Sequence, residues 1–214
     1  MFDNREQAGF QLAKRLKGRD LHDPLILAIP RGGIVVGAAL AQELNGELDV
    51  VLARKLRAPS DPEVAIGAIA ENGAVALDPD ADDMLCTSET YFTEERRYQL
   101  AEIERRKKVL RAIRPPASIE GRMVIVTDDG IATGSTMIAA LKMVRMHQPR
   151  ELIVAVPVGS PDGLENVRHW CDELYCVERR RHFWAIGQFY RDFAEVNDDQ
   201  VCHLLRSCLP AAQP

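Results

Sequence analysis

The apolar residues of this chain follow two spacings. Residues 4–17 repeat apolar positions every three or four residues, as in an amphipathic helix, whereas 25–30 is a continuous apolar run of the kind found in a buried strand. The same two patterns predict further helices at 34–44, 88–113, 136–147, 161–170 and 195–209 and further strands at 48–56, 123–127, 152–158 and 173–177. Strand, helix and strand in succession indicate parallel units. We therefore expect an α/β fold with a central parallel sheet flanked by helices.

Residues 57–88 break this alternation. They contain three Pro and two Gly between short apolar runs, which predicts a loop followed by a hairpin-like pair of strands. The long charged helix that follows has Ser88 or Thr93 as its candidate N-cap.

Length and composition narrow the class of protein. A chain of 214 residues with 46% apolar residues suits one α/β domain with an appendage, or two small domains, and we treat 1–214 as a single domain. The net charge of −5 argues against a protein that coats nucleic acid. The charged, amphipathic N-terminus and the lack of an 18-residue apolar run predict a cytoplasmic protein without a membrane partner.

The five cysteines form no CxxC pair, which does not favour a zinc site or a disulfide framework. We interpret Cys171 and Cys176 as small buried residues, with a metal role as the weaker alternative.

Polar segments, two of them with glycines, lie at the ends of three of the predicted strands. They are IPRGG at 29–33, RKLR at 54–57 and TDDGIATGST at 127–136. Ligands of open parallel sheets bind beyond the carboxyl ends of the strands, so these three segments predict one binding crevice.

The stretch VIVTDDGIATGST at 124–136 carries the most specific chemistry. Gly130, Gly134 and the hydroxyls after them precede a helix, and a helix N-terminus of this kind binds phosphate. Asp128 and Asp129 would repel that phosphate, but they suit the vicinal hydroxyls of a sugar or a magnesium ion reached through water. The combination describes a ribose 5-phosphate. The plainer alternative is an acidic N-cap followed by a glycine-rich turn.

This stretch resembles the phosphoribosyl-diphosphate (PRPP) motif of the type I phosphoribosyltransferases. With AIPRGG, RKL and IGAIAENG, the chain is more narrowly similar to a group of bacterial predicted phosphoribosyltransferases whose acceptor the resemblance does not imply. The resemblance implies that family's fold, with a small hood and lid subdomain. It also implies transfer of a phosphoribosyl group between PRPP-Mg²⁺ and a nitrogenous base, with Asp128 and Asp129 helping to hold the Mg²⁺. The 5-phosphate loop would consist of Ala132, Thr133, Gly134, Ser135 and Thr136.

Under the same resemblance, IPRGG is the pyrophosphate loop, formed by Pro30, Arg31, Gly32 and Gly33. The two glycines let the backbone approach an anion closely, and the Arg31 fork can hold phosphate oxygens. A cis peptide bond is expected at Pro30–Arg31 or Arg31–Gly32. The alternative is a tight turn with an incidental arginine.

Arg54 and Lys55 follow in the second strand, and alternation along a strand predicts that one of them reaches the site. We choose Lys55, and we take Asp128, Asp129, Arg31 and Lys55 as the catalytic residues. Residues 57–90 resemble the family's mobile loop and lid insertion, in which Arg57 could reach the leaving group. A solvated surface role for Arg57 is nearly as well supported.

Residues 178–214 are expected to form a C-terminal hood and helix. Phe183 and Trp184, followed by Gly187, resemble the segment that covers the base in purine-type members, although the spacing is shorter. Interleaved basic and aromatic residues also suit nucleic acid, and Trp184 could instead pack in the core.

One position departs from the family pattern. Members that act on 6-oxopurines usually carry an aspartate where this chain has Ala132, so hypoxanthine and guanine are predicted to be poor substrates. Glu71 is a candidate general base. Two alternatives to a transferase stay open: a PRPP-binding regulatory protein whose hood contacts RNA or a partner, and an enzyme that acts on a phosphorylated sugar without transfer. We also expect a homodimer.

Overall fold

The computed structural model describes residues 1–59, 65–77 and 89–208. Its centre is a five-stranded sheet in the order β2-β1-β6-β7-β8, and every neighbouring pair is parallel. The strands are β1 (Leu25–Ala28), β2 (Glu47–Val50), β6 (Met123–Thr127), β7 (Glu151–Gly159) and β8 (Glu173–Arg179). The predicted central parallel sheet is therefore confirmed.

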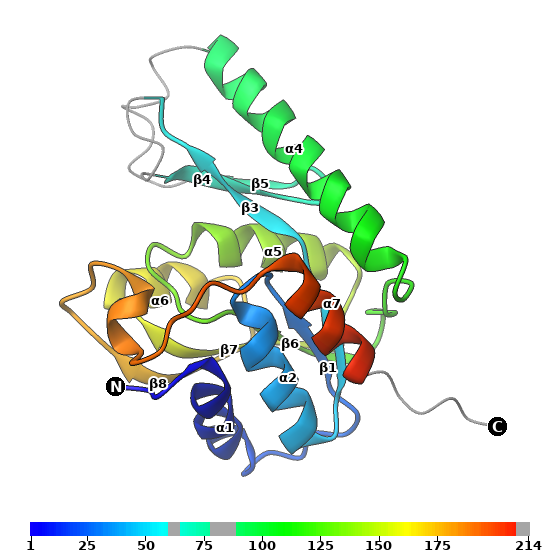
Figure 1. Cartoon of the computed structure of the whole chain (residues 1–214), viewed down its shortest axis with the longest axis vertical. Coiled ribbons are helices and arrows are strands. Elements are labelled where there is room, and N and C mark those ends of the chain that lie inside the picture. The colour runs from blue at the N-terminus through cyan, green and yellow to red at the C-terminus, as the bar shows by residue number, and fades with distance from the viewer. Residues whose placement is uncertain (60–64, 78–88, 209–214) are drawn as a thin grey trace.

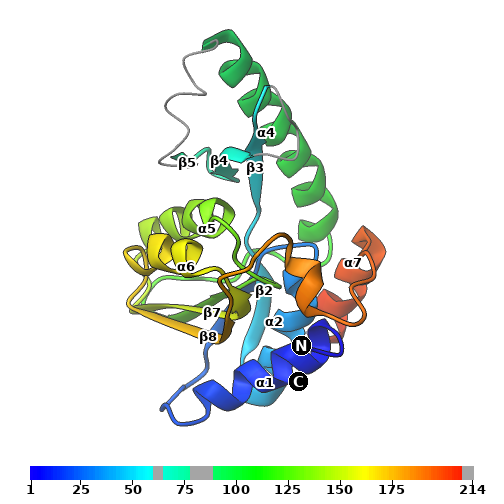
Figure 2. The same ribbon diagram turned by 90° about the vertical axis from the view of Figure 1, so that its left-hand side faces the viewer.

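Helices cover both faces of this sheet (Figure 2). One layer contains α1 (Arg5–Leu16), α2 (Gly33–Leu44) and α7 (Asp198–Ser207), and the other contains α5 (Ser135–Met146) and α6 (Pro161–Arg168). Side chains alternate between the two layers along each strand. In β1, for example, Ile26 packs in the first core, whereas Leu25 and Leu27 pack in the second.

A second unit stands beyond one end of the sheet (Figure 1). It consists of an antiparallel sheet of β3 (Ala53–Arg57), β4 (Ala65–Ala70) and β5 (Val75–Leu77), with α4 (Glu89–Arg111) packed against it. We call this unit the lid. The predicted hairpin is thus confirmed, and the loop that we expected to be mobile lies largely at 60–64, outside the described residues.

The prediction of one strand over 48–56 is wrong. β2 ends at Val50, and Val51 makes one more hydrogen bond, from its N–H to the Ala28 carbonyl. The chain then enters β3, which pairs with β4 instead. The reason is that β1 ends at Ala28 and turns into the IPRGG loop, so a longer β2 would have no partner.

The structure excludes one of the two candidate N-caps of α4. Thr93 lies inside the helix, where its hydroxyl donates to the Glu89 carbonyl at 3.0 Å, so it is not the cap. Ser88 lies outside the described residues. Among the helices that the structure describes, none is long and apolar enough to span a bilayer.

Candidate active site

The loop between β6 and α5 surrounds a small cavity. Gly134 precedes α5 with a φ of 93°, a left-handed conformation that favours glycine, and a Cβ there would lie 2.9 Å from the Gly163 carbonyl oxygen. The hydroxyls of Thr133 and Ser135 lie 3.0 Å apart. The cavity measures 60 Å³ and is lined by Gly130 to Met137 together with Lys55, Asp128 and Ile186. Its size and its place at a helix N-terminus suit a single phosphate group.

The two adjacent aspartates have different surroundings. Asp128 is partly exposed and lines the small cavity. Asp129 is buried, and its Oδ2 accepts a hydrogen bond from Arg5 Nε at 2.8 Å. The Asp129 carbonyl also accepts from the Tyr190 hydroxyl at 2.6 Å. Of the two, Asp128 is therefore the one placed to meet a ligand directly.

Arg5 was missed in the sequence analysis. It lies at the start of α1, its Nη1 donates to the Ala194 carbonyl at 2.8 Å, and its guanidinium lies 3.6 Å from the centre of the Phe193 ring. Arg5 thus joins the N-terminus, Asp129 and the C-terminal segment. The helical spacing of 4–17 predicted α1 but gave no sign that its first residue pairs with a strand end more than 120 residues away.

The surroundings of the Asp128 and Asp129 carboxyl groups disfavour their ionised forms. Burial raises the pKa of Asp128 well above its ordinary value, and the neighbouring Asp129 raises it further. Burial also raises the pKa of Asp129, although Arg5 opposes the change. A cation or a hydroxyl donor at Asp128 would favour its ionised form.

The glycines of the IPRGG loop leave room for these aspartates. A Cβ on Gly32 would overlap Asp129 Oδ2 and lie 2.7 Å from its Cγ, and one on Gly33 would lie 2.9 Å from Asp128 Cα. The Pro30–Arg31 peptide bond is cis, as expected. Arg31 forms an ion pair with Glu195, which lies shortly before α7. The two glycines thus accommodate the aspartates, and their predicted role in letting an anion approach the backbone stays a prediction.

A larger, cationic cavity adjoins the small one. It measures 320 Å³ and shares Lys55, Asp128 and Thr136 with the small cavity, and Pro30 also lines it. Its cationic side chains are Arg54, Lys55, Arg57 and Arg106. Lys55 therefore reaches both cavities, as expected. The expectation that Arg54 points away is wrong, because it lines the larger cavity while its Nε donates to Gln99 at 2.5 Å.

Arg57 lies at the end of β3 and not in a loop. Its guanidinium donates to both oxygens of Glu95 at 2.8 Å, and its backbone N–H donates to the same carboxylate at 3.0 Å. Glu95 is buried, and its hydrogen bonds lower its pKa to about 2 despite that burial. Arg57 is thus anchored to α4 at the rim of the cavity, and its role at a leaving group stays a prediction.

Arg106 is a second residue that the sequence analysis missed. Burial lowers the pKa of its guanidinium, and the charges of Arg54 and Arg31 lower it further. Its buried Nε has no hydrogen-bond partner among the described residues. An anion in the larger cavity would offer an acceptor to this Nε and offset the repulsion from Arg54 and Arg31. The sequence of α4 predicts a charged helix, and no motif in it marks Arg106.

The hood residues differ in their environments. Phe183 packs on Phe189, with 4.9 Å between ring centres, whereas Trp184 is 88% exposed. The alternative of Trp184 as a core residue is therefore wrong. Ile186, from the 3-10 helix η2 (Ile186–Phe189), lines the small cavity, and it would lie 2.8 Å from a Cβ on Gly130.

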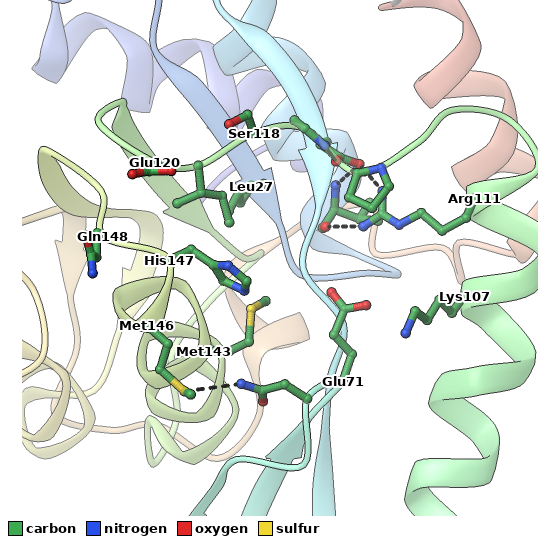
Figure 3. Close-up of a pocket in the computed structure, with 16 residues that line it drawn as sticks. Leu27, Glu71, Lys107, Arg111, Ser118, Glu120, Met143, Met146, His147 and Gln148 are labelled. Carbon is green, nitrogen blue, oxygen red and sulfur yellow. Dashed lines mark hydrogen bonds and ion pairs between the residues drawn. The ribbon is translucent and has the colours of Figure 1, made fainter.

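Glu71 is not brought to this site. It lines a separate cavity between the lid and the core, shown in Figure 3, which shares no residue with the two cavities described above. Cys171 and Cys176 are free and half-buried, and burial raises the pKa of each thiol to about 11. In the part of the chain that the structure describes, no three His, Cys, Asp or Glu side chains are grouped so that they could hold a metal ion.

Comparisons with known proteins agree with this geometry. The sequence model of a protein family, the phosphoribosyl transferase domain, matches residues 3–194 of this chain. A crystal structure of the protein TT1426 from Thermus thermophilus is 40% identical, with a TM-score of 0.81 over 98% of this chain and 99% of that chain. A provisionally named phosphoribosyl transferase of Mycobacterium tuberculosis is 37% identical over 205 residues, which are 96% of this chain and 46% of the relative.

The chain belongs to the phosphoribosyl transferase family, and the expected fold class is confirmed. It spans about half the length of the curated relatives that it matches.

Proposed function

We propose that this protein binds PRPP with Mg²⁺ and transfers its phosphoribosyl group to a nitrogenous base, releasing pyrophosphate. The observation that carries the proposal is that Asp128, Lys55 and Thr136 line both the 60 Å³ and the 320 Å³ cavity. The small cavity would hold the 5-phosphate, Asp128 the ribose hydroxyls, and the larger cationic cavity the diphosphate.

The reaction breaks the bond between the anomeric carbon and the diphosphate oxygen and forms a bond from that carbon to a base nitrogen, which loses its proton. Positive charge develops on the sugar and negative charge on the leaving group. Lys55, Arg57 and Arg106 face the leaving group, while Asp128 and the phosphate loop fix the sugar. Catalysis would then rest on positioning and charge stabilisation.

The residues present fit a Mg²⁺ ion that arrives with its substrate. Magnesium is commonly bound by one or two carboxylates together with substrate phosphates, and Asp128 is one partly exposed carboxylate beside a cationic cavity. Asp129 is engaged by Arg5 and would act by holding the loop. When bound, Mg²⁺ would neutralise charge on the leaving diphosphate.

The exposed Trp184 is available to stack on the acceptor base, which the site does not identify. The test is pyrophosphate release from PRPP-Mg²⁺ across adenine, hypoxanthine, guanine, xanthine, uracil and orotate. We expect turnover with at least one base and little with hypoxanthine or guanine. No release with any base, by a protein that binds PRPP, would favour a PRPP-binding regulatory protein over a transferase.

A further inference from the structure

The largest cavity described lies away from the proposed active site. It measures 610 Å³ and is lined by residues of both the lid and the core. The lid contributes Glu71, Asn72 and two residues of α4, and the core contributes β1, β2, residues 116–120 and the end of α5 (Figure 3). Helix α5 has 12 residues, so the cavity at its end lies about 18 Å along the helix from the phosphate loop at its start. This volume is within the range of small-molecule sites.

Glu71 points into this cavity, which is also lined by other polar side chains such as His147 and Lys107 (Figure 3). It is half-buried, and its backbone N–H donates to the Leu52 carbonyl at 2.9 Å, which fixes its position. Burial raises the pKa of its carboxyl group. Within the described residues, no cation lies within ion-pairing distance of this carboxylate.

The two nearby cations are engaged elsewhere. Arg111 donates from Nη1 to Asp49 at 2.7 Å and from Nη2 to the Val50 carbonyl at 3.2 Å. Lys107 forms an ion pair with Glu104 at 3.2 Å. Asp49 and the exposed Glu120 line the cavity as well, so its lining carries both positive and negative charges and favours neither a cationic nor an anionic ligand. A neutral ligand with hydrogen-bond donors fits this balance.

Another part of the lining contains apolar and thioether side chains, next to His147. Leu27 and Met143 are buried at its floor, and Met146, 69% exposed, stands at its rim with its sulfur 3.4 Å from the Asn72 amide nitrogen. Thioethers make favourable contacts with aromatic rings. In the view of Figure 3, Met143 and Lys107 lie on either side of the Glu71 carboxylate.

We propose that this cavity binds a flat, uncharged heterocycle with two adjacent N–H donors, such as the edge of a guanine, paired with both oxygens of Glu71 and lying on Met143 and Met146. A carboxylate offers two acceptor oxygens side by side, and paired N–H donors match them. The proposal does not rest on the transfer reaction.

The test is titration calorimetry with guanosine, whose N9 already carries a ribose and so cannot accept another. Inosine, which lacks the amino group, and adenosine, which lacks the ring N–H, should bind more weakly. Glu71→Gln should weaken guanosine binding by about tenfold or more, because the amide replaces one acceptor with a donor. The exposed Glu94→Gln on α4 is the matched control and should bind like the wild type.

Two further variants test whether a change in guanosine binding arises from misfolding or from binding at the proposed active site. Met146→Ser changes an exposed side chain and should also weaken binding, whereas Asp128→Asn should leave guanosine binding unchanged. Failure of guanosine to bind the wild type, equal binding by Glu71→Gln, or loss of binding in Asp128→Asn would each overturn the proposal.

Discussion

The Arg5 guanidinium and the Asp129 carboxylate form a buried ion pair, with 2.8 Å between Nε and Oδ2, beneath the candidate active site. The pair joins the first turn of α1 to the carboxyl end of β6. Because Arg5 also donates to the Ala194 carbonyl, the ion pair connects the C-terminal segment to the carboxyl end of β6, next to the proposed phosphate loop. One aspartate of the motif is thereby structural, and the other is left for a ligand.

Arg5→Met should lower the free energy of unfolding by about 3–5 kcal/mol, because it leaves the buried Asp129 carboxylate without its partner. Urea denaturation measures the change. Arg191→Met is the matched control, since Arg191 pairs with Asp3 at the surface, and it should cost no more than about 1 kcal/mol. Similar losses in the two variants would show that the Arg5 pair has no special role.

Gly32→Ala should destabilise the protein by about 1–3 kcal/mol or more, because the added Cβ would overlap the carboxylate of Asp129. Gly18→Ala is the control, because a Cβ at Gly18 would meet no atom within 4 Å. Thermal unfolding of the two variants gives the comparison. An unchanged melting temperature for Gly32→Ala would contradict the close packing of the IPRGG loop on Asp129.

Trp184→Ala should reduce base transfer without lowering stability. The side chain is 88% exposed, so its loss costs little in folding, whereas loss of stacking on a base is worth about 1–3 kcal/mol. The steady-state KM for the base should therefore rise about tenfold, while PRPP affinity stays the same. Phe183→Ala, which removes a ring packed on Phe189, should instead lower the melting temperature. Unchanged kinetics in Trp184→Ala would remove this residue from the base site.

Glu95 should contribute to acid unfolding. Its pKa in the folded protein is lowered to about 2, below its value in the unfolded chain, so its stabilising effect is present above about pH 4.5 and is lost as the pH falls toward 2. The wild type should therefore lose more stability than Glu95→Gln over this window. Urea unfolding at several pH values measures the difference, and parallel pH profiles for the two proteins would rule out the effect.

The local patterns of the sequence were enough to predict the parallel sheet and the glycine-containing loop between β6 and α5, and the binding of a phosphate by this loop stays a prediction. Buried strands such as 123–127 are continuous apolar runs, and the loop from Asp128 to Thr136 is one contiguous motif. The same local patterns predicted a single strand where the structure has β2 and β3. The apolar pattern of 48–56 does not show that β1 ends at Ala28, so that a longer β2 would have no partner.

The unpredicted parts of the site depend on contacts between distant segments. Arg5 meets Asp129 across 124 positions, and Arg106 reaches the cationic cavity from a helix whose sequence shows clusters of charged residues but no motif. Glu71 was considered as a base because it is an acid among apolar residues, but the fold of the lid places it in another cavity. In each case spatial neighbours, and not spacing along the chain, decide the role.

The most direct test of the central proposal is isothermal titration of PRPP in the presence of Mg²⁺ against the wild type, Asp128→Asn and Asp20→Asn. Asp128 is the ligand-facing aspartate, whereas Asp20 is an exposed surface carboxylate. The account predicts saturable binding to the wild type, binding at least about tenfold weaker to a folded Asp128→Asn protein, and unchanged binding to Asp20→Asn. Absence of PRPP binding to the wild type, or equal binding to the wild type and Asp128→Asn, would contradict it.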